Sequence, residues 1–235
     1  MMTNTGAGPG DEEAGGEGQR QRAGQAGALH WLTVQDDLLR SLAHALSNRV
    51  GTVMALSALL ETGTDPARIG KGLSEETERM DQLLRLLRAV SRPAEPTIEP
   101  MLLSDAMDVA VRLAGEHVAA RSVRVSWADE SLSLPVRADP MAVAHAATVA
   151  LLSVARWAGP DGRVRVTVRT AGDRVEAILC PEAEVSVADA DLGDRAAEGA
   201  TAITWLLAAC GGVALTPTGG LGFSLPGLGA RRSGA

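Results

Sequence analysis

The chain has 235 residues, of which 46% are hydrophobic, and a formal net charge of −7. This length allows one large domain or two small ones, each with a hydrophobic core. The acidic balance, together with one Phe and no Tyr, provides neither a basic track for nucleic-acid phosphates nor aromatic platforms for stacked bases. We therefore expect no nucleic-acid partner.

The first 28 residues are dominated by Gly, Ala, Glu, Gln and Arg. A segment of this composition buries too little apolar surface to fold by itself, so residues 1–28 are predicted to be a disordered tail. The sequence shows no secretory signal and no run of about 20 apolar residues that could cross a membrane. We expect a cytoplasmic protein without membrane contact.

Residues 29–92 have the pattern of a helical hairpin. Apolar side chains recur at steps of three and four from residue 29 to residue 60, and again from residue 69 to residue 90, after a break at Gly63, Asp65 and Pro66. Glu76 is the one polar residue in register with the second run. The apolar seam is larger than one hairpin can hide, so residues 29–91 are predicted to form a homodimer with a four-helix bundle. The seam comprises Leu32, Leu39, Leu42, Leu46, Val53, Leu56, Leu60, Ile69, Leu73, Met80, Leu83, Leu87 and Val90.

A second domain is predicted over residues 101–228, after a stiff proline-containing linker at residues 93–100. Two alternating segments flank Ala171-Gly172-Asp173, which indicates a tight β-hairpin. The expected helices span residues 102–120, 140–157 and 196–209, and the expected strands span residues 123–127, 134–137, 163–170, 174–180, 213–216 and 222–225. The predicted fold class is therefore α+β, with a helical hairpin followed by an α/β sandwich that has helices on one face of a mixed sheet.

His44 lies in the first helix, two residues from each of the seam positions Leu42 and Leu46. At about 100° per residue, this spacing directs its ring away from the seam and into water. Asn48 follows one turn later on the same side. A neutral imidazole is a good nucleophile near neutral pH, and it can return a phosphoryl group to a carboxylate. The residues alone also allow an ordinary surface histidine here, and His30, His117 and His145 are expected to have structural or solvated roles.

A mid-helix histidine on a dimerising hairpin, followed by an α/β domain, resembles the two-component histidine kinases. The resemblance implies that the second domain has the Bergerat ATP-binding fold. In that family, a helix opened by Asp carries two Asn residues, one of which holds magnesium. Here Asp139-Pro140 opens the helix, but the Asn positions fall at about Val149 and Ser153, which are poor magnesium ligands.

Two further departures from the family affect nucleotide chemistry. The family places an Asp and two Gly residues after a strand to bind adenine, whereas this chain has Cys180-Pro181-Glu182-Ala183-Glu184. Most of these kinases also place Glu or Asp directly after the phosphoacceptor histidine as a base, and this chain has Ala45. Gly199, Gly211-Gly212 and the segment 220–226 match the family, but as scaffold features.

A hairpin with a degenerate Bergerat domain resembles the dimeric histidine phosphotransferases of the ChpT type, over roughly residues 32–226. The resemblance implies that His44, assisted by Asn48, relays a phosphoryl group between response-regulator receiver domains without ATP. A hybrid histidine kinase would be a further partner. No cofactor or metal is expected in this chain, because magnesium would be held by the receiver and because Cys180 and Cys210 lack metal-ligand spacing. The alternatives are a non-catalytic pseudokinase that binds a kinase or a receiver, and a divergent sensor histidine kinase.

Overall fold

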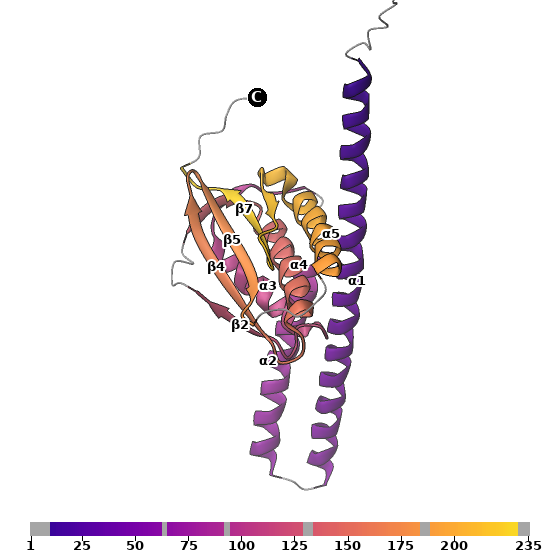
Figure 1. Cartoon of the computed structure of the whole chain (residues 1–235). Helices are drawn as coiled ribbons and strands as arrows, with labels where there is room; N and C mark the ends of the chain where they lie inside the picture. Colours follow the sequence, from indigo (N-terminus) through magenta and orange to yellow (C-terminus); the bar gives the residue numbers. More distant parts are fainter. Residues whose placement is uncertain (1–9, 63–64, 92–94, 129–133, 184–188, 230–235) are drawn as a thin grey trace, which may run out of the picture.

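A computed structural model describes residues 10–62, 65–91, 95–128, 134–183 and 189–229. Figure 1 shows a long hairpin of two helices, with the second domain beside the upper part of the hairpin. The helices are α1 (Gly10–Glu61), α2 (Pro66–Val90), α3 (Leu103–Glu116), α4 (Pro140–Ala158), α5 (Asp189–Leu207) and the short 3-10 helix η2 (Ala208–Cys210). The strands are β1 (Glu99–Leu102), β2 (Arg124–Trp127), β3 (Pro135–Ala138), β4 (Arg163–Ala171), β5 (Arg174–Pro181), β6 (Val213–Leu215) and β7 (Leu221–Pro226).

Helix α1 begins at Gly10, well before residue 29, where the sequence predicted the helix to start after a disordered tail. Residues 1–9 of that tail lie outside the described residues. Gly27 is buried where α1 crosses α5, and a Cβ atom there would lie 2.7 Å from the carbonyl oxygen of Thr201 and 2.7 Å from Cβ of Trp205. Around Gly27, α5 gives the helix a packing surface that the local sequence does not indicate, and such tertiary contacts supply most helical stability in proteins. At Gly18 and Gly24, further toward the N-terminus, a Cβ atom would meet nothing within 4 Å.

Helix α2 begins where the sequence breaks the apolar pattern. Asp65 caps it, with its carboxylate 3.0 Å from the backbone nitrogen of Ala67, and Pro66 occupies the first turn. The helix ends at Ser91, whose backbone is extended. The hairpin predicted from residues 29–92 is therefore present as α1 and α2, which lie side by side (Figure 1).

The second domain contains a five-stranded sheet in the order β2-β4-β5-β7-β6. Strand β2 runs parallel to β4, and the other neighbouring strands are antiparallel, so the sheet is mixed. Gly172, with φ +63°, makes the turn of the β4–β5 hairpin. Helices α4 and α5 pack on one face of the sheet and α3 packs on α4 (Figure 1). The predicted fold class, a helical hairpin followed by helices on one face of a mixed sheet, is confirmed.

The predicted linker is shorter than residues 93–100, because Glu99 and Pro100 belong to strand β1. Strand β1 pairs with β3 in a separate two-stranded sheet, with Glu99 opposite Ala138 and Leu102 opposite Pro135. A four-residue edge strand that contains Pro has almost no local signature, because its only partner is distant in the sequence. Strand β3 also packs against β7 of the main sheet, and an isolated bridge joins its Val136 to Gly227, directly after β7.

Helix α4 forms the centre of the second domain. It is the one helix among the described residues that is long and apolar enough to cross a membrane, but 83% of that stretch is buried inside the fold. Its N-terminal cap is Asp139, which is 4% exposed and accepts hydrogen bonds from the backbone nitrogens of Ala142 at 2.9 Å and Thr97 at 2.8 Å. The Asp that opens this helix is thus used to hold the fold together.

Candidate functional site

His44 lies in the middle of α1 and is exposed, as its spacing from the seam predicts. Leu42, two residues earlier, is 2% exposed and belongs to the core. Asn48, one turn later, is also exposed, and its Nδ2 lies 3.3 Å from Nε2 of His44. The structure therefore brings together the two site residues that the sequence singled out.

No carboxylate contacts His44 within the described part of the chain. Ala45, the next residue, is half-buried. The nearby carboxylates of α1 pair instead with Arg40, with Asp37 3.0 Å away and Asp36 also in contact. An adjacent base speeds attack on a poor phosphoryl donor, and these surroundings do not supply one.

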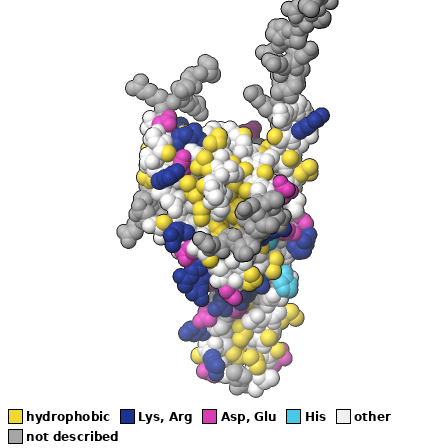
Figure 2. Space-filling view, viewed as in Figure 1, with side chains coloured by type: hydrophobic (Ala, Val, Ile, Leu, Met, Phe, Trp, Pro, Cys, Tyr) yellow, Lys and Arg dark blue, Asp and Glu magenta, His cyan; other side chains and the backbone are white. Residues whose placement is uncertain are grey.

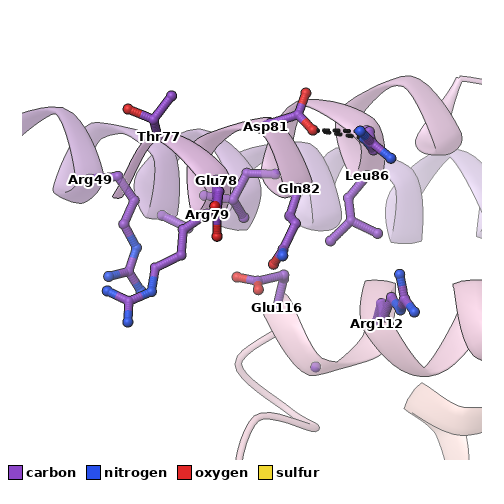
Figure 3. Close-up of a pocket in the computed structure, with 13 residues that line it drawn as sticks. Arg49, Thr77, Glu78, Arg79, Asp81, Gln82, Leu86, Arg112 and Glu116 are labelled. Carbon is purple, nitrogen blue, oxygen red and sulfur yellow. Dashed lines mark hydrogen bonds and ion pairs between the residues drawn. The ribbon is translucent and has the colours of Figure 1, made fainter. Parts of the chain in front are cut away.

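A groove of about 990 Å³ begins at Ala45 and Arg49 of α1, although His44 does not line it, and it runs between α2 and the end of α3 (Figure 3). Glu76 of α2 lies near the α1 edge of the groove and is 5% exposed. Its carboxylate forms ion pairs with Arg79 of α2 and with Arg49 of α1, the latter at 3.4 Å. Glu76 is the polar seam residue noted in the sequence. Its burial is compensated because one carboxylate is shared by two guanidinium groups.

The other wall of the groove comes from α3, through Arg112, Gly115 and Glu116. Gln82 extends from α2 toward Glu116 in Figure 3. Within the described residues, Arg112 and Glu116 make no hydrogen bond or ion pair with another side chain. Unpaired hydrogen-bonding groups therefore line the wall of the groove that the second domain forms.

The positions that the resemblance assigns to magnesium-binding Asn residues are buried in α4. Val149 is 1% exposed and Ser153 is 7% exposed. Neither provides the carboxylate or amide oxygen that magnesium prefers. Among the described residues, no group of three or more His, Cys, Asp or Glu side chains is placed to hold a metal ion.

The end of β5, where the resemblance would place an adenine-binding Asp, borders a hollow of about 940 Å³. Glu182 lies at its edge and accepts a hydrogen bond from the hydroxyl of Ser126, with Arg165 at 3.7 Å and Arg163 at 3.9 Å. The Ser126 hydrogen bond, followed by the two arginines, lowers the pKa of Glu182 against the opposing effect of burial. This carboxylate is engaged by neighbouring strands. The remaining lining includes Trp157, Cys180, Pro181, Gly193, Thr216, Gly219 and Gly220.

The hairpin and the second domain are joined by a contact that the sequence analysis did not single out. The indole of Trp31 on α1 stacks on the imidazole of His145 on α4, and Nε2 of His145 lies 2.6 Å from the carbonyl oxygen of Ala89 on α2. The amide of Gln35 also donates to the carbonyl oxygen of Val90 at 3.1 Å. These contacts hold α1, α2 and α4 together above His44.

The three histidines expected to be structural all lie at the junction of α1 with the second domain. His145 is fully buried, and His30 is half-buried. His117 is 4% exposed; its Nδ1 accepts a hydrogen bond from the backbone nitrogen of Ala119, and its Nε2 lies 3.9 Å from Asp37. Burial, reinforced by the nearby positive charge of Arg156, lowers the pKa values of His30 and His117.

No protein-family model and no curated protein sequence matches this chain. Solved structures of histidine kinases are similar to it at low identity. A histidine kinase from Burkholderia phymatum is 12% identical, with 88% of this chain and 97% of that chain covered and a TM-score of 0.44. The Acinetobacter baumannii histidine kinase AdeS is 12% identical, with 80% and 98% covered and a TM-score of 0.43. The histidine kinase ThkA in complex with response regulator protein TrrA is 13% identical, with 83% and 63% covered and a TM-score of 0.37.

Proposed function

We propose that this protein is a histidine phosphotransferase of a two-component phosphorelay. His44 carries the phosphoryl group between receiver domains, and the protein does not use ATP. The observation that carries the proposal is the exposed pair of His44 and Asn48 on α1, 3.3 Å apart and without a carboxylate base. The buried Val149 and Ser153, at the positions of the two family Asn residues of which one holds magnesium, support transfer without ATP.

The reaction is an exchange of one bond to phosphorus. A ring nitrogen of His44 attacks the phosphorus of a receiver's aspartyl phosphate, the N–P bond forms, and the bond from phosphorus to the aspartate oxygen breaks as the carboxylate leaves. Attack by the aspartate of a second receiver reverses these changes. Asn48 donates a hydrogen bond to the transferring group or orients the ring. Magnesium is supplied by the receiver, so this chain needs no cofactor.

In this proposal, the hairpin of a second copy of the chain pairs with this hairpin to form a four-helix bundle. Hydrophobic side chains are exposed on the hairpin below the second domain (Figure 2), and none of the described segments of this chain covers them. Pairing two hairpins in a four-helix bundle would bury them. The exposed hydrophobic residues of α1 and α2 are Leu29, Leu32, Val50, Met54, Leu59, Leu60 and Leu84.

The second domain acts in this proposal as a docking and stabilising module. Its α3 forms one wall of the charged groove that begins at Ala45, next to His44 (Figure 3). A receiver whose aspartate reaches His44 would come within reach of Arg49 on α1 and Arg112 on α3. Because receivers are cytoplasmic domains, we expect the protein to act in the cytoplasm.

The decisive experiment is labelled-phosphate transfer from a panel of phosphorylated receiver domains to the wild type and to His44→Gln. Gln keeps a polar, solvent-exposed side chain but has no nucleophilic ring nitrogen, so labelling should be lost while folding and dimer content stay the same. Ser47→Ala, on the exposed surface of the same turn, is the matched control and should be labelled like the wild type. Equal labelling of His44→Gln would favour a non-catalytic pseudokinase.

Calorimetric titration with ATP and magnesium separates the relay from a divergent kinase. We expect no heat of binding up to millimolar nucleotide, because the magnesium-binding and adenine-binding positions hold other residues. A micromolar dissociation constant would favour the kinase.

A further inference from the structure

The five-stranded sheet has helices on one face, and its opposite face carries arginines. Along β4, every second residue from Val164 to Val168 is buried in the core. The alternate residues point to the other face, where the side chains of Arg163, Arg165 and Arg169 are 59%, 56% and 61% exposed. In Figure 2, Lys and Arg side chains lie along the left side of the second domain, where Figure 1 shows β2 and β4. We call this surface the outer arginine face, and its charged residues are Arg124, Arg163, Arg165, Arg169, Arg174, Glu176 and Glu182.

Three arginines meet at one end of the outer arginine face. Arg124 of β2 lies directly opposite Arg163 of β4, and Arg165 follows two residues later on the same side. The carboxylate of Glu182 lies 3.9 Å from the guanidinium of Arg163 and 3.7 Å from that of Arg165, and it also accepts a hydrogen bond from the hydroxyl of Ser126. Among the described residues, the guanidinium of Arg124 forms no ion pair or hydrogen bond. Three guanidinium groups therefore lie around one carboxylate.

The stability of the sheet does not explain this arrangement. Like charges directly opposite each other on neighbouring strands are destabilising, and Arg124 opposite Arg163 is such a pair. The exposed ion pairs with Glu182 contribute little in return. With five arginines and two glutamates, the outer arginine face has a net charge of about +3, whereas the whole chain has −7. Positive charge concentrated on one face of an acidic protein attracts an anionic partner to that face.

The middle of the outer arginine face is less polar than its ends. Thr167 lies between Arg165 and Arg169 on β4, and its partner on β5 is the half-buried Ile178. On the other side of Ile178, β7 presents Gly222, which adds no side chain. An apolar strip thus crosses the sheet with an arginine on each side of it. The complementary ligand is a segment in which acidic side chains flank an apolar one.

We propose that the outer arginine face docks an acidic peptide segment of a protein partner. The segment places an apolar side chain on Ile178 and carboxylates on the guanidinium groups of Arg163 and Arg165, which can each donate two parallel hydrogen bonds. A short segment touches only this face, whereas a nucleic acid would also meet the acidic remainder of the surface. The proposal does not depend on phosphotransfer, because these residues neither line the groove that begins at Ala45 nor contact His44.

The test is fluorescence anisotropy of a labelled synthetic peptide that has three glutamates on each side of one leucine, titrated with the full-length protein. We expect saturable binding that weakens as the salt concentration rises, because the charges are exposed. A peptide with alanine in place of the leucine should bind more weakly, and a peptide with lysines in place of the glutamates should not bind. Equal binding of the glutamate and lysine peptides would overturn the proposal.

Variants separate docking at this face from attraction by charge in general. Arg163→Gln should weaken peptide binding roughly two- to fivefold, the range for one exposed charge pair. Combining it with Arg124→Gln and Arg165→Gln should weaken binding about tenfold or more. Arg68→Gln, at an exposed position on α2, removes the same charge from the hairpin and should leave the affinity unchanged. Equal losses in Arg68→Gln and Arg163→Gln would contradict a docking site on the sheet.

Thermal unfolding tests whether Arg124 serves the fold or the partner. The melting temperature of Arg124→Gln should equal or exceed that of the wild type, because the repulsion from Arg163 is removed. A melting temperature several degrees lower would assign Arg124 to the stability of the sheet and remove it from the docking site.

Two further measurements test other occupants of this face. A single-stranded oligonucleotide with the same number of negative charges as the peptide should bind more weakly than the peptide, and tighter binding would overturn the proposal in favour of nucleic acid. In sedimentation velocity, Arg163→Gln should have the same oligomeric state as the wild type. A larger assembly of the wild type that is lost in Arg163→Gln would show instead that a second copy of this chain occupies the face.

Discussion

The indole of Trp31 and the imidazole of His145 are stacked, with ring centroids 4.3 Å apart and an interplanar angle of 28°. Trp31 is 2% exposed and His145 is 0% exposed, so the pair lies inside the junction between the hairpin and the second domain. The helix that carries His44 is thereby fixed to the domain that forms one wall of the groove beside it.

Trp31→Ala should lower the free energy of unfolding by about 3–5 kcal/mol, because a large buried side chain is replaced by a cavity and the stack is lost. The measurement is chemical denaturation followed by circular dichroism. Thr33→Ala, at an exposed position two residues away, is the control and should change stability by about 0.5 kcal/mol or less. A loss in Trp31→Ala as small as that in Thr33→Ala would show that the junction contributes little to stability.

Asn48→Ala should keep the fold and the dimer but slow phosphoryl transfer to His44. The amide of Asn48 lies 3.3 Å from Nε2 of His44, and loss of one orienting hydrogen bond costs roughly tenfold in rate. The rate is measured in single-turnover transfer from a phosphorylated receiver. Thr52→Ala, one turn further on α1, should transfer at the wild-type rate. A wild-type rate for Asn48→Ala would remove Asn48 from the site but leave His44 in it.

Met54→Glu should shift the protein from dimer to monomer, because Met54 is 68% exposed in the single chain and would be buried by the second hairpin. Sedimentation velocity at micromolar concentration measures the change. Thr52→Glu is the matched control, since two residues along a helix correspond to a rotation of about 160°. A monomeric wild type would contradict the four-helix bundle itself.

Stability should fall as the pH drops below about 6.5, because His30 and His117 have lower pKa values in the folded protein than the ordinary value of 6.5. The unfolded chain then binds more protons than the folded one, so the stabilisation is fully present above pH 6.5 and is lost as the pH falls toward the folded pKa values. For both histidines, burial is the largest cause. Arg156 acts in the same direction, whereas Glu198 opposes it at His30 and Asp37 opposes it at His117.

This pH dependence is measured by chemical denaturation at pH values from about 5 to about 8, because histidine changes its charge in that range. In the variant His117→Gln, the drop below pH 6.5 should be smaller than in the wild type. An equal drop would assign the effect to other groups.

The sequence alone determined the helical hairpin, the architecture of the second domain and the proximity of His44 to Asn48. The positions of His44 and Asn48 depend on local spacing, because their offsets from the buried Leu42 place both side chains on the outside of α1. The predicted seam marked only part of the buried face, since Leu32 is 55% exposed whereas Trp31 and Leu38 are buried. The β4–β5 hairpin was equally local, because Gly172 and two alternating segments specify it.

Only the tertiary structure decided how the two parts meet. At Gly27, α1 packs on α5, more than 150 residues away in sequence, and the stack of Trp31 on His145 joins residues whose spacing along the chain has no pattern. Arg124 and Arg163 likewise become neighbours only through the pairing of β2 with β4. Hydrophobic periodicity shows which face of an element is buried, but it does not show which other element covers that face.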